Sequence, residues 1–278
     1  MDFTIDRSSL LKPLGHIYSV VERRNTIPIL SNVLIETNSS QVLFTATDMD
    51  IDIVETVKCI VTSQGKVTVS AHTLYDIARK LTDGSEISIK LIDTNLEVSA
   101  GKSKFILPTL PVDDYPIMTE IENGNKFSIQ SVDLASLIDN TKFAISLEET
   151  RYYLNGIFLH VPETNKDKLR VVATDGHRLA QAEIPLPNGA ENIPSIILPR
   201  KAVGEIRKLT DITDGSIEII ISDTKAKFIF PNAVLTTKLI DGSFPDYQRV
   251  IPKENLNKLI VSNSDFSKAI DRVSTVSI

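Results

Sequence analysis

Three aspartates at alternate positions are the first residues in this sequence that could support chemistry: Asp48, Asp50 and Asp52. On a strand such carboxylates share one face, where they could hold a divalent cation for a nuclease. Their spacing also matches the start of a calcium-binding loop, which needs glycine at its sixth position and glutamate at its twelfth. Ile53 and Cys59 stand there instead. The favoured interpretation is a solvated polar face without metal or cofactor, and the metal site stays an alternative.

Asp175 and His177 form a second candidate, because an acid two residues from a histidine could take part in acid–base or triad chemistry. No G-x-S-x-G motif accompanies them, and the chain has no P-loop and no G-x-G-x-x-G motif. The four histidines lack the spacing of metal ligands: His16, His72, His160 and His177. We therefore expect a protein without catalytic residues.

Composition sets the class of protein. The 278 residues suffice for about two domains. The single cysteine excludes an intrachain disulfide and fits a reducing compartment. The polar N-terminus lacks a signal peptide, and no stretch approaches the roughly 18 apolar residues of a membrane helix. A soluble cytoplasmic protein without a membrane partner is expected.

The chain contains internal repeats. FTIDRSSLLKPL from Phe3 aligns with FSIQSVDLASLI from Phe127 and with LIVSNSDFSKAI from Leu259. Further landmarks recur in the same order, 127 to 132 residues apart: Asp48 with Asp175, Lys80 with Lys208, and Tyr115 with Tyr247. Matching landmarks in one order indicate tandem copies of one structural unit. The predicted domains are residues 1–120, 121–252 and an incomplete third unit, 253–278, which would need about another hundred residues.

Each unit combines few helices with many strands. The pattern predicts helices at residues 8–23, despite Pro13 and Gly15, and at 72–81, ended by Asp83-Gly84. The corresponding windows later in the chain are 133–142, 199–209 and 265–272. Alternating segments predict strands, among them QVLFTAT, EISIKLI, NLEVSA, KFILPTL, SIEIIISD and AKFIFPN. The fold class is therefore α+β with mostly antiparallel sheet.

Charge is distributed unevenly between helices and strands. The helical windows, with the first taken as residues 8–24, together carry +5, so the rest of the chain carries −11 to give the net charge of −6. If the helices line one surface, that surface can attract phosphates without reading bases. The alternative is that lysine and arginine simply favour helices and solvent.

Four segments carry a family resemblance: TIPILSNVLI from Thr26, RYYLNGIFL from Arg151, VATDGHRLA from Val172 and LIDGSFPDYQRVIP from Leu239. They closely resemble the bacterial DNA polymerase III beta subunit family of sliding clamps, over the whole chain and in order. The resemblance implies a DNA-clamp fold, with tandem domains that each place two helices on one face and antiparallel sheets on the other. It further implies a homodimeric ring of full-length, three-domain subunits that encircles double-stranded DNA non-specifically and acts as a processivity factor. The present chain would end early in the third domain.

The resemblance also implies a peptide-binding pocket for the DNA polymerase III catalytic subunit, the clamp loader and other proteins with clamp-binding motifs. The matching positions are Leu154, Thr174, Gly176, His177, Arg178, Leu179, Pro245, Arg249 and Val250. An aliphatic pocket would bury leucine or phenylalanine side chains at about 25 cal/mol per Å². The alternatives are that Leu154 and Leu179 are core residues and that Asp175-Gly176 is only a turn. The family's far pocket wall comes from the end of the third domain, which this chain lacks.

For DNA contact, the matching positions are Arg24, Tyr152, Tyr153, Arg200 and Lys201. Tyrosines can touch the sugar-phosphate backbone, although both could instead be packing residues. The adjacent Glu148 and Glu149 depart from this pattern, because an acidic pair would repel phosphate.

Three functions therefore compete. The first is a DNA-encircling clamp, the second a peptide-binding scaffold with incidental DNA affinity, and the third a metal-dependent nuclease using the aspartates. The repeats favour the clamp, since an enzyme rarely needs three copies of one domain.

Overall fold

The computed structural model describes residues 1–22, 26–252 and 254–277. They form two compact units, Met1–Phe244 and Pro245–Ile278, and each is described by itself. The first unit contains two of the repeats, called here repeat 1 (residues 1–115) and repeat 2 (residues 125–244). The domain boundaries expected at residues 120 and 252 stay predictions.

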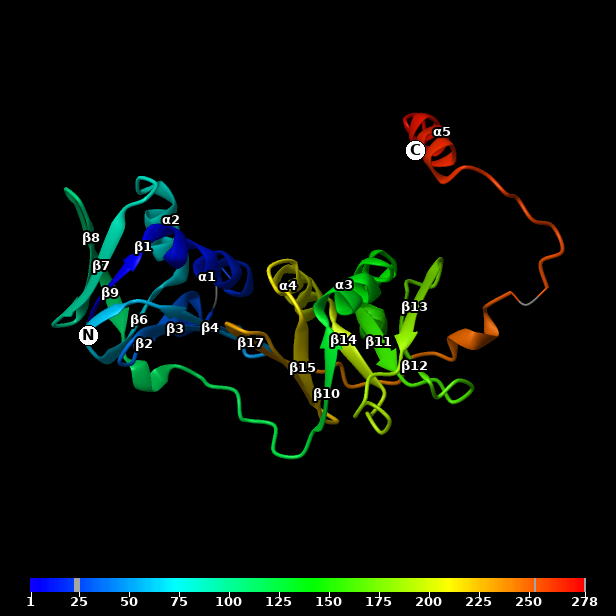
Figure 1. Cartoon of the computed structure of the whole chain (residues 1–278), viewed down its shortest axis with the longest axis horizontal. Helices are drawn as coiled ribbons and strands as arrows, with labels where there is room; N and C mark the ends of the chain where they lie inside the picture. The colour runs from blue at the N-terminus through cyan, green and yellow to red at the C-terminus, as the bar shows by residue number, and fades with distance from the viewer. Residues whose placement is uncertain (23–25, 253, 278) are drawn as a thin grey trace. The chain divides into compact units, whose positions relative to one another are not determined.

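Repeat 1 follows the predicted order of strand, helix, strands, helix and strands (Figure 1). Its elements are β1 Asp2–Asp6, α1 Arg7–Val20, η1 Pro28–Ser31, β2 Asn32–Thr37, β3 Gln41–Thr47, β4 Ile51–Lys58, β5 Ile60–Ser63, β6 Gly65–Ser70, α2 Ala71–Lys80, β7 Glu86–Ile92, β8 Asn95–Ala100, β9 Ser103–Leu110 and η2 Val112–Asp114.

Repeat 2 has the same plan with additional short 3-10 helices. Its elements are β10 Asn125–Gln130, α3 Ser131–Asp139, η3 Lys142–Ala144, η4 Glu149–Leu154, β11 Gly156–His160, β12 Lys168–Thr174, β13 Leu179–Pro185, β14 Ile196–Pro199, α4 Arg200–Asp211, β15 Ser216–Ile221, β16 Lys225–Ile229 and β17 Ala233–Lys238.

The strands pair antiparallel, and one sheet continues from repeat 2 into repeat 1. Its order is β10-β15-β16-β17-β4-β3-β2-β6-β9-β8-β7-β1-β5, and a second sheet has the order β13-β12-β11-β14. The repeats join where β17 pairs with β4, with Leu235 opposite Ile53. The expected α+β class with antiparallel sheets is confirmed.

The first-unit helices share one side of the sheets. In Figure 1, α2, α1, α4 and α3 all lie on the same side of the strands, and α1 contacts both α2 and α4 while α3 contacts α4. The first helix begins where the Asp6 carboxylate accepts the Ser8 and Ser9 amides at 2.7 and 3.3 Å. It runs without a break through Pro13 and ends at Val20, short of the expected residue 23.

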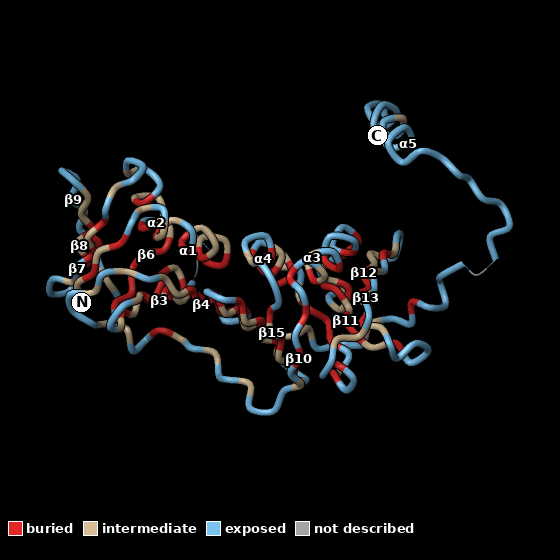
Figure 2. The backbone as a smooth tube through the Cα atoms, viewed as in Figure 1, coloured by how far each residue is buried: buried red, intermediate tan, exposed pale blue. Residues whose placement is uncertain are grey.

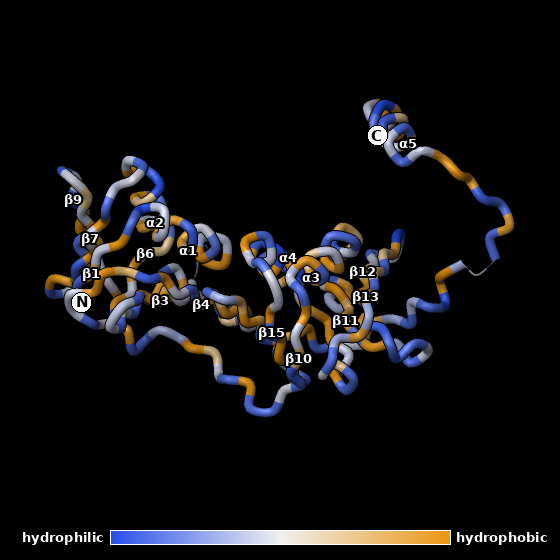
Figure 3. The backbone as a smooth tube through the Cα atoms, in the orientation of Figure 1, coloured by the Kyte–Doolittle hydropathy of each residue, from blue (hydrophilic) through white to orange (hydrophobic). Residues whose placement is uncertain are grey.

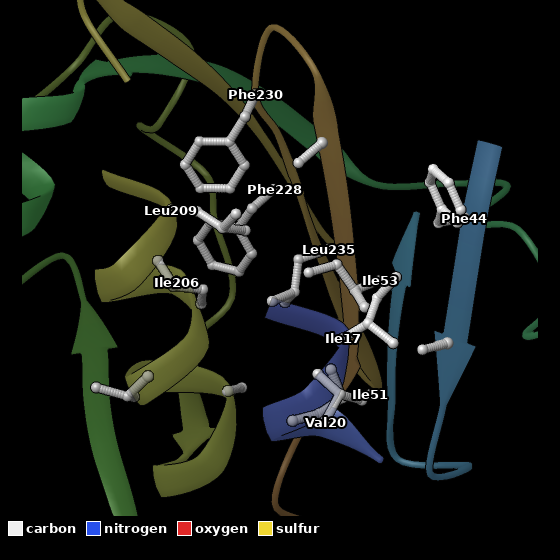
Figure 4. Packing of buried hydrophobic residues seen from close by; sticks show 14 of the residues in the cluster. Ile17, Val20, Phe44, Ile51, Ile53, Ile206, Leu209, Phe228, Phe230 and Leu235 are labelled. Carbon is white, nitrogen blue, oxygen red and sulfur yellow. The ribbon is translucent and has the colours of Figure 1, made fainter. Parts of the chain in front are cut away.

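A hydrophobic core runs under these helices and across the repeat junction. Burial alternates along the strands and follows the inner faces of the helices (Figure 2), and apolar residues follow the same pattern (Figure 3). Figure 4 shows Ile206 and Leu209 of α4 beside Phe228, and Ile17 of α1 near Leu235 and Ile53. Because Leu235 and Ile53 belong to different repeats, the two repeats share one continuous core.

The second unit contains η5, Tyr247–Arg249, and α5, Asn263–Ser274. The Ser262 hydroxyl caps α5 by accepting the Asp265 amide at 3.4 Å. The apolar residues Phe266, Ile270 and Val273 of α5 are exposed. No helix among the described residues is long and apolar enough to cross a membrane.

Candidate functional site

The turn between β12 and β13 presents most of the predicted pocket residues of the first unit. The Asp175 carboxylate accepts the backbone N–H groups of His177 and Arg178, each at 2.9 Å. Gly176 has a φ of +87°, a backbone conformation that residues with a Cβ rarely adopt. The turn therefore holds Gly176, His177 and Arg178 exposed at the end of a rigid hairpin.

Arg178 projects over an apolar side chain that the sequence analysis did not identify. Its Nε donates to the Asp175 carboxylate at 3.0 Å, and its guanidinium carbon lies 5.7 Å from the centre of the Phe143 ring. Phe143 and Leu147 are 56% and 68% exposed, although both are large and apolar. With His177, Arg178 and Arg200 they line a groove of about 340 Å³. Phe143 and Leu147, each next to a charged residue in the segment before η4, were the sequence signal that could have identified this groove.

Arg151 fixes the loop next to this turn. Its guanidinium donates to both Glu148 carboxylate oxygens, at 2.8 and 2.6 Å, and to the Asp175 carbonyl at 3.2 Å. A Cβ added to Gly176 would approach the Arg151 Nη1 to 2.6 Å, so the two segments meet closely. The hydrogen bond from Arg151 lowers the pKa of Glu148. Glu148 therefore acts as a paired carboxylate, and the repulsion expected from it is partly compensated.

The remaining pocket positions differ in exposure. Leu154 is 3% exposed and belongs to the buried residues, whereas Thr174 and Leu179 are half-buried. Pro245, Arg249 and Val250 are exposed and lie in the second unit. There Arg249 Nε donates to the Asp246 carboxylate at 2.7 Å.

The positions predicted to contact DNA differ in exposure and in their partners. Tyr152 is 54% exposed and packs edge-to-face on Tyr153, with ring centres 5.7 Å apart, within η4. Arg200 is exposed at the start of α4, and its side chain has no ion-pair partner among the described residues. Lys201 already bonds to the Asp48 carboxylate and, at 2.9 Å, to the Val20 carbonyl. Arg24 lies outside the described residues.

The three alternating aspartates do not share a strand face, so that expectation was wrong. Asp48 and Asp50 lie in the turn before β4, where Met49 has a φ of +76°, and only Asp52 is in the strand. Burial raises the pKa of Asp52, while hydrogen bonds from Thr47 and the Met118 amide oppose the rise. Across the part of the chain that the structure describes, no three His, Cys, Asp or Glu side chains are grouped to hold a metal.

Comparison with known proteins identifies the family of this chain. Two family models match, described as the N-terminal and the central domain of the DNA polymerase III beta subunit, over residues 1–119 and 128–246. The chain belongs to the DNA polymerase III beta subunit family. A relative from Caulobacter vibrioides, named beta sliding clamp, is 49% identical over the whole chain, which spans 75% of that relative. A beta sliding clamp from Pseudomonas aeruginosa is 38% identical, with the same coverage.

Solved structures of the family agree with the fold. The sliding clamp from Caulobacter crescentus matches with a TM-score of 0.92 at 48% identity, over all of this chain and 76% of the other. The sliding clamp from Bartonella birtlesii bound to griselimycin matches with a TM-score of 0.96 at 48% identity, over all of this chain and 75% of the other. The resemblance read from the sequence motifs is thus confirmed, and so is the DNA-clamp fold.

The turn beside β13 makes a prediction about pH. The Arg178 and His177 amides, with the Arg178 side chain, lower the pKa of Asp175 to about 2. Because this folded-state pKa lies below the ordinary value of 3.8, the stabilisation by the carboxylate is complete above that value. It is lost as the pH falls towards 2. Carboxyl carbon NMR of Asp175 should give a midpoint near 2.

A matched variant separates the causes of this shift. Arg178→Ala keeps the residue-178 amide, which makes the largest contribution, so the midpoint should stay below 3.8. A midpoint at or above 3.8 in the unsubstituted chain would contradict the turn geometry.

Proposed function

We propose that this chain is a subunit of a DNA sliding clamp, which encircles duplex DNA and tethers the DNA polymerase III catalytic subunit and other replication and repair proteins. The observation that carries this proposal is the placement of α1, α2, α3 and α4 on one side of a sheet that continues through both repeats. Family membership supports the same function. We further propose that the ring is a homodimer.

The charge of the helical face supports non-specific DNA binding. The helices within their observed bounds carry +3, so the rest of the chain carries −9. The surplus is below the expected +5 because Lys142 lies beyond the end of α3 and Asp211 lies inside α4. A weakly basic face attracts phosphates without holding the ring at one sequence, as sliding requires.

Within that face, the individual contacts are proposals of different strength. Arg200 is the best supported, because its guanidinium is exposed and unpaired among the described residues. Tyr152, which is exposed, and the half-buried Tyr153 offer an aromatic pair beside the compensated Glu148 carboxylate. Lys201 is the weakest, because a phosphate would have to compete with the Asp48 carboxylate for its ammonium group.

The tethering site would form around the Asp175–Leu179 turn. Arg178 and His177 offer polar contacts at an exposed edge, and Leu179 and Thr174 offer partly exposed surface. A peptide from the polymerase, the clamp loader or another clamp-binding protein would bury apolar side chains there. Pro245, Arg249 and Val250, which are exposed, stay proposed peptide-contacting positions.

The clamp function needs no catalytic residue. Asp175 caps a turn, and Asp48, Asp50 and Asp52 bond to different partners instead of converging on one site. We further propose a cytoplasmic location, because the bacterial chromosome is the site of action.

The orientation of the helical face can be tested by photo-crosslinking. A benzoylphenylalanine in place of Lys12, which is exposed on α1, should form adducts with bound duplex DNA. The matched position is Lys90 on β7, where the neighbouring Ile87 and Ile89 face the core and Lys90 faces the other way. The Lys90 variant should yield little adduct. Equal or greater labelling from Lys90 would contradict the assignment of the DNA-facing side.

The tethering site can be tested by calorimetry with a polymerase III-derived peptide. Arg178→Ala should weaken binding by about 1 kcal/mol or more, roughly a fivefold rise in Kd, because an exposed guanidinium at the pocket edge is lost. Arg79→Ala, which removes an exposed arginine of α2, is the control and should leave the Kd unchanged. An unchanged Kd for Arg178→Ala would refute the pocket assignment.

A further inference from the structure

The two repeats contain the same turn at equivalent places. In residues 47–51 and again in residues 174–178, an aspartate carboxylate accepts the amides two and three residues ahead, at 2.7 to 2.9 Å. The hydroxyl of the threonine before the aspartate accepts the amide of the residue after the aspartate, at 2.9 Å in repeat 1 and 3.1 Å in repeat 2. The residue after the aspartate has positive φ in both, Met49 and Gly176. Both repeats therefore contain the same hydrogen-bonded turn.

The surroundings of the two turns differ. In repeat 1, the Asp48 carboxylate accepts the Lys201 ammonium from α4 of repeat 2. The Asp50 carboxylate accepts the Lys238 ammonium at 3.1 Å, and the Asp50 carbonyl accepts the Lys238 amide at 2.9 Å. Lys201 also donates to the Val20 carbonyl at the end of α1. The turn of repeat 1 is thus bonded to repeat 2 through both of its carboxylates, Asp48 and Asp50.

Asp52, which lies in β4, is the third of the alternating aspartates. Its buried carboxylate accepts the Thr47 hydroxyl and, at 2.9 Å, the Met118 amide of the segment that connects the repeats. Asp48, Asp50 and Asp52, called here the junction carboxylates, therefore each accept a bond from repeat 2 or from the connecting segment. The alternating spacing that suggested a metal site serves contacts with three separate partners.

We propose that the junction carboxylates fix the orientation of repeat 2 on repeat 1. Asp48 makes the largest contribution among the ion pairs, because it and Lys201 are only 12% and 36% exposed, whereas Asp50 and Lys238 are both largely exposed. The consequence for a ring rests on the proposed function: a fixed angle between repeats would set the curvature of the DNA-facing helices. The contacts themselves do not depend on that function.

The same comparison explains why only one of the two turns is a candidate peptide site. The positions of repeat 2 equivalent to Asp50 and Asp52 are His177 and Leu179. Neither side chain is a carboxylate, so repeat 2 lacks counterparts of the two acceptors that bind Lys238 and the Met118 amide in repeat 1. The turn of repeat 2 keeps its shape through Asp175 and leaves His177 exposed.

Native-state hydrogen exchange of the full chain tests the proposal. Asp48→Asn keeps an oxygen that accepts the turn amides but removes the charge opposite Lys201. The Lys238 amide, which closes the β4–β17 junction, should then exchange about five- to tenfold faster. Lys201→Met should have a similar effect. The double variant should raise the exchange rate of the Lys238 amide as much as either single variant does. The two effects should not multiply, because each substitution removes the same ion pair.

Asp175→Asn is the matched control, because it makes the same change in the same turn of repeat 2. It should leave exchange at the Lys238 amide unchanged. The proposal is overturned if Asp48→Asn leaves that amide unchanged, if the Asp48 and Lys201 effects multiply, or if Asp175→Asn accelerates it equally. Failure of DNA or peptide binding would not alter these outcomes, so the proposed function and the junction are tested separately.

Discussion

The pairing of β17 with β4 is the interaction on which the rest of the first unit depends. It extends an antiparallel sheet from one repeat into the next with a defined register, from Ala233 opposite Glu55 to Thr237 opposite Ile51. Because each repeat packs its two helices on the same side of its strands, a continuous sheet places all of them on one side of the unit. The helical face is therefore a consequence of strand pairing rather than of contacts between helices alone.

The core and the polar contacts both reinforce this junction. Apolar side chains of both repeats form one buried cluster, so separating the repeats would expose hydrophobic surface. Between α1 and α4, the Ser19 hydroxyl donates to the buried Glu205 carboxylate at 2.7 Å, and Lys208 compensates that charge at 2.8 Å. Burying a carboxylate is costly unless it is paired, so this contact favours one arrangement of the two helices.

Local sequence patterns predicted the helices and strands well, because the residues that determine each helix or strand lie within it. Alternating apolar residues marked the strands, and the helices of repeat 2 begin within two residues of the predicted windows. The repeats predicted two equivalent units. The contacts of Lys201 with the Asp48 carboxylate and of Arg151 with the Asp175 carbonyl were missed, since they depend on the packing of separate segments. The aspartates were misplaced because methionine by itself does not indicate a turn, although the alignment of Asp48 with Asp175 places Met49 opposite Gly176, and both residues have positive φ.

Encirclement is the way in which we propose that this protein holds DNA. The direct measurement is retention on nicked circular DNA after loading by the clamp loader, followed by cutting the circle with a restriction enzyme. We predict that the protein stays on the circle during gel filtration and leaves once the DNA is linear, because a ring slides off free ends. Equal retention on linear DNA would show that direct contacts hold the protein and would contradict encirclement.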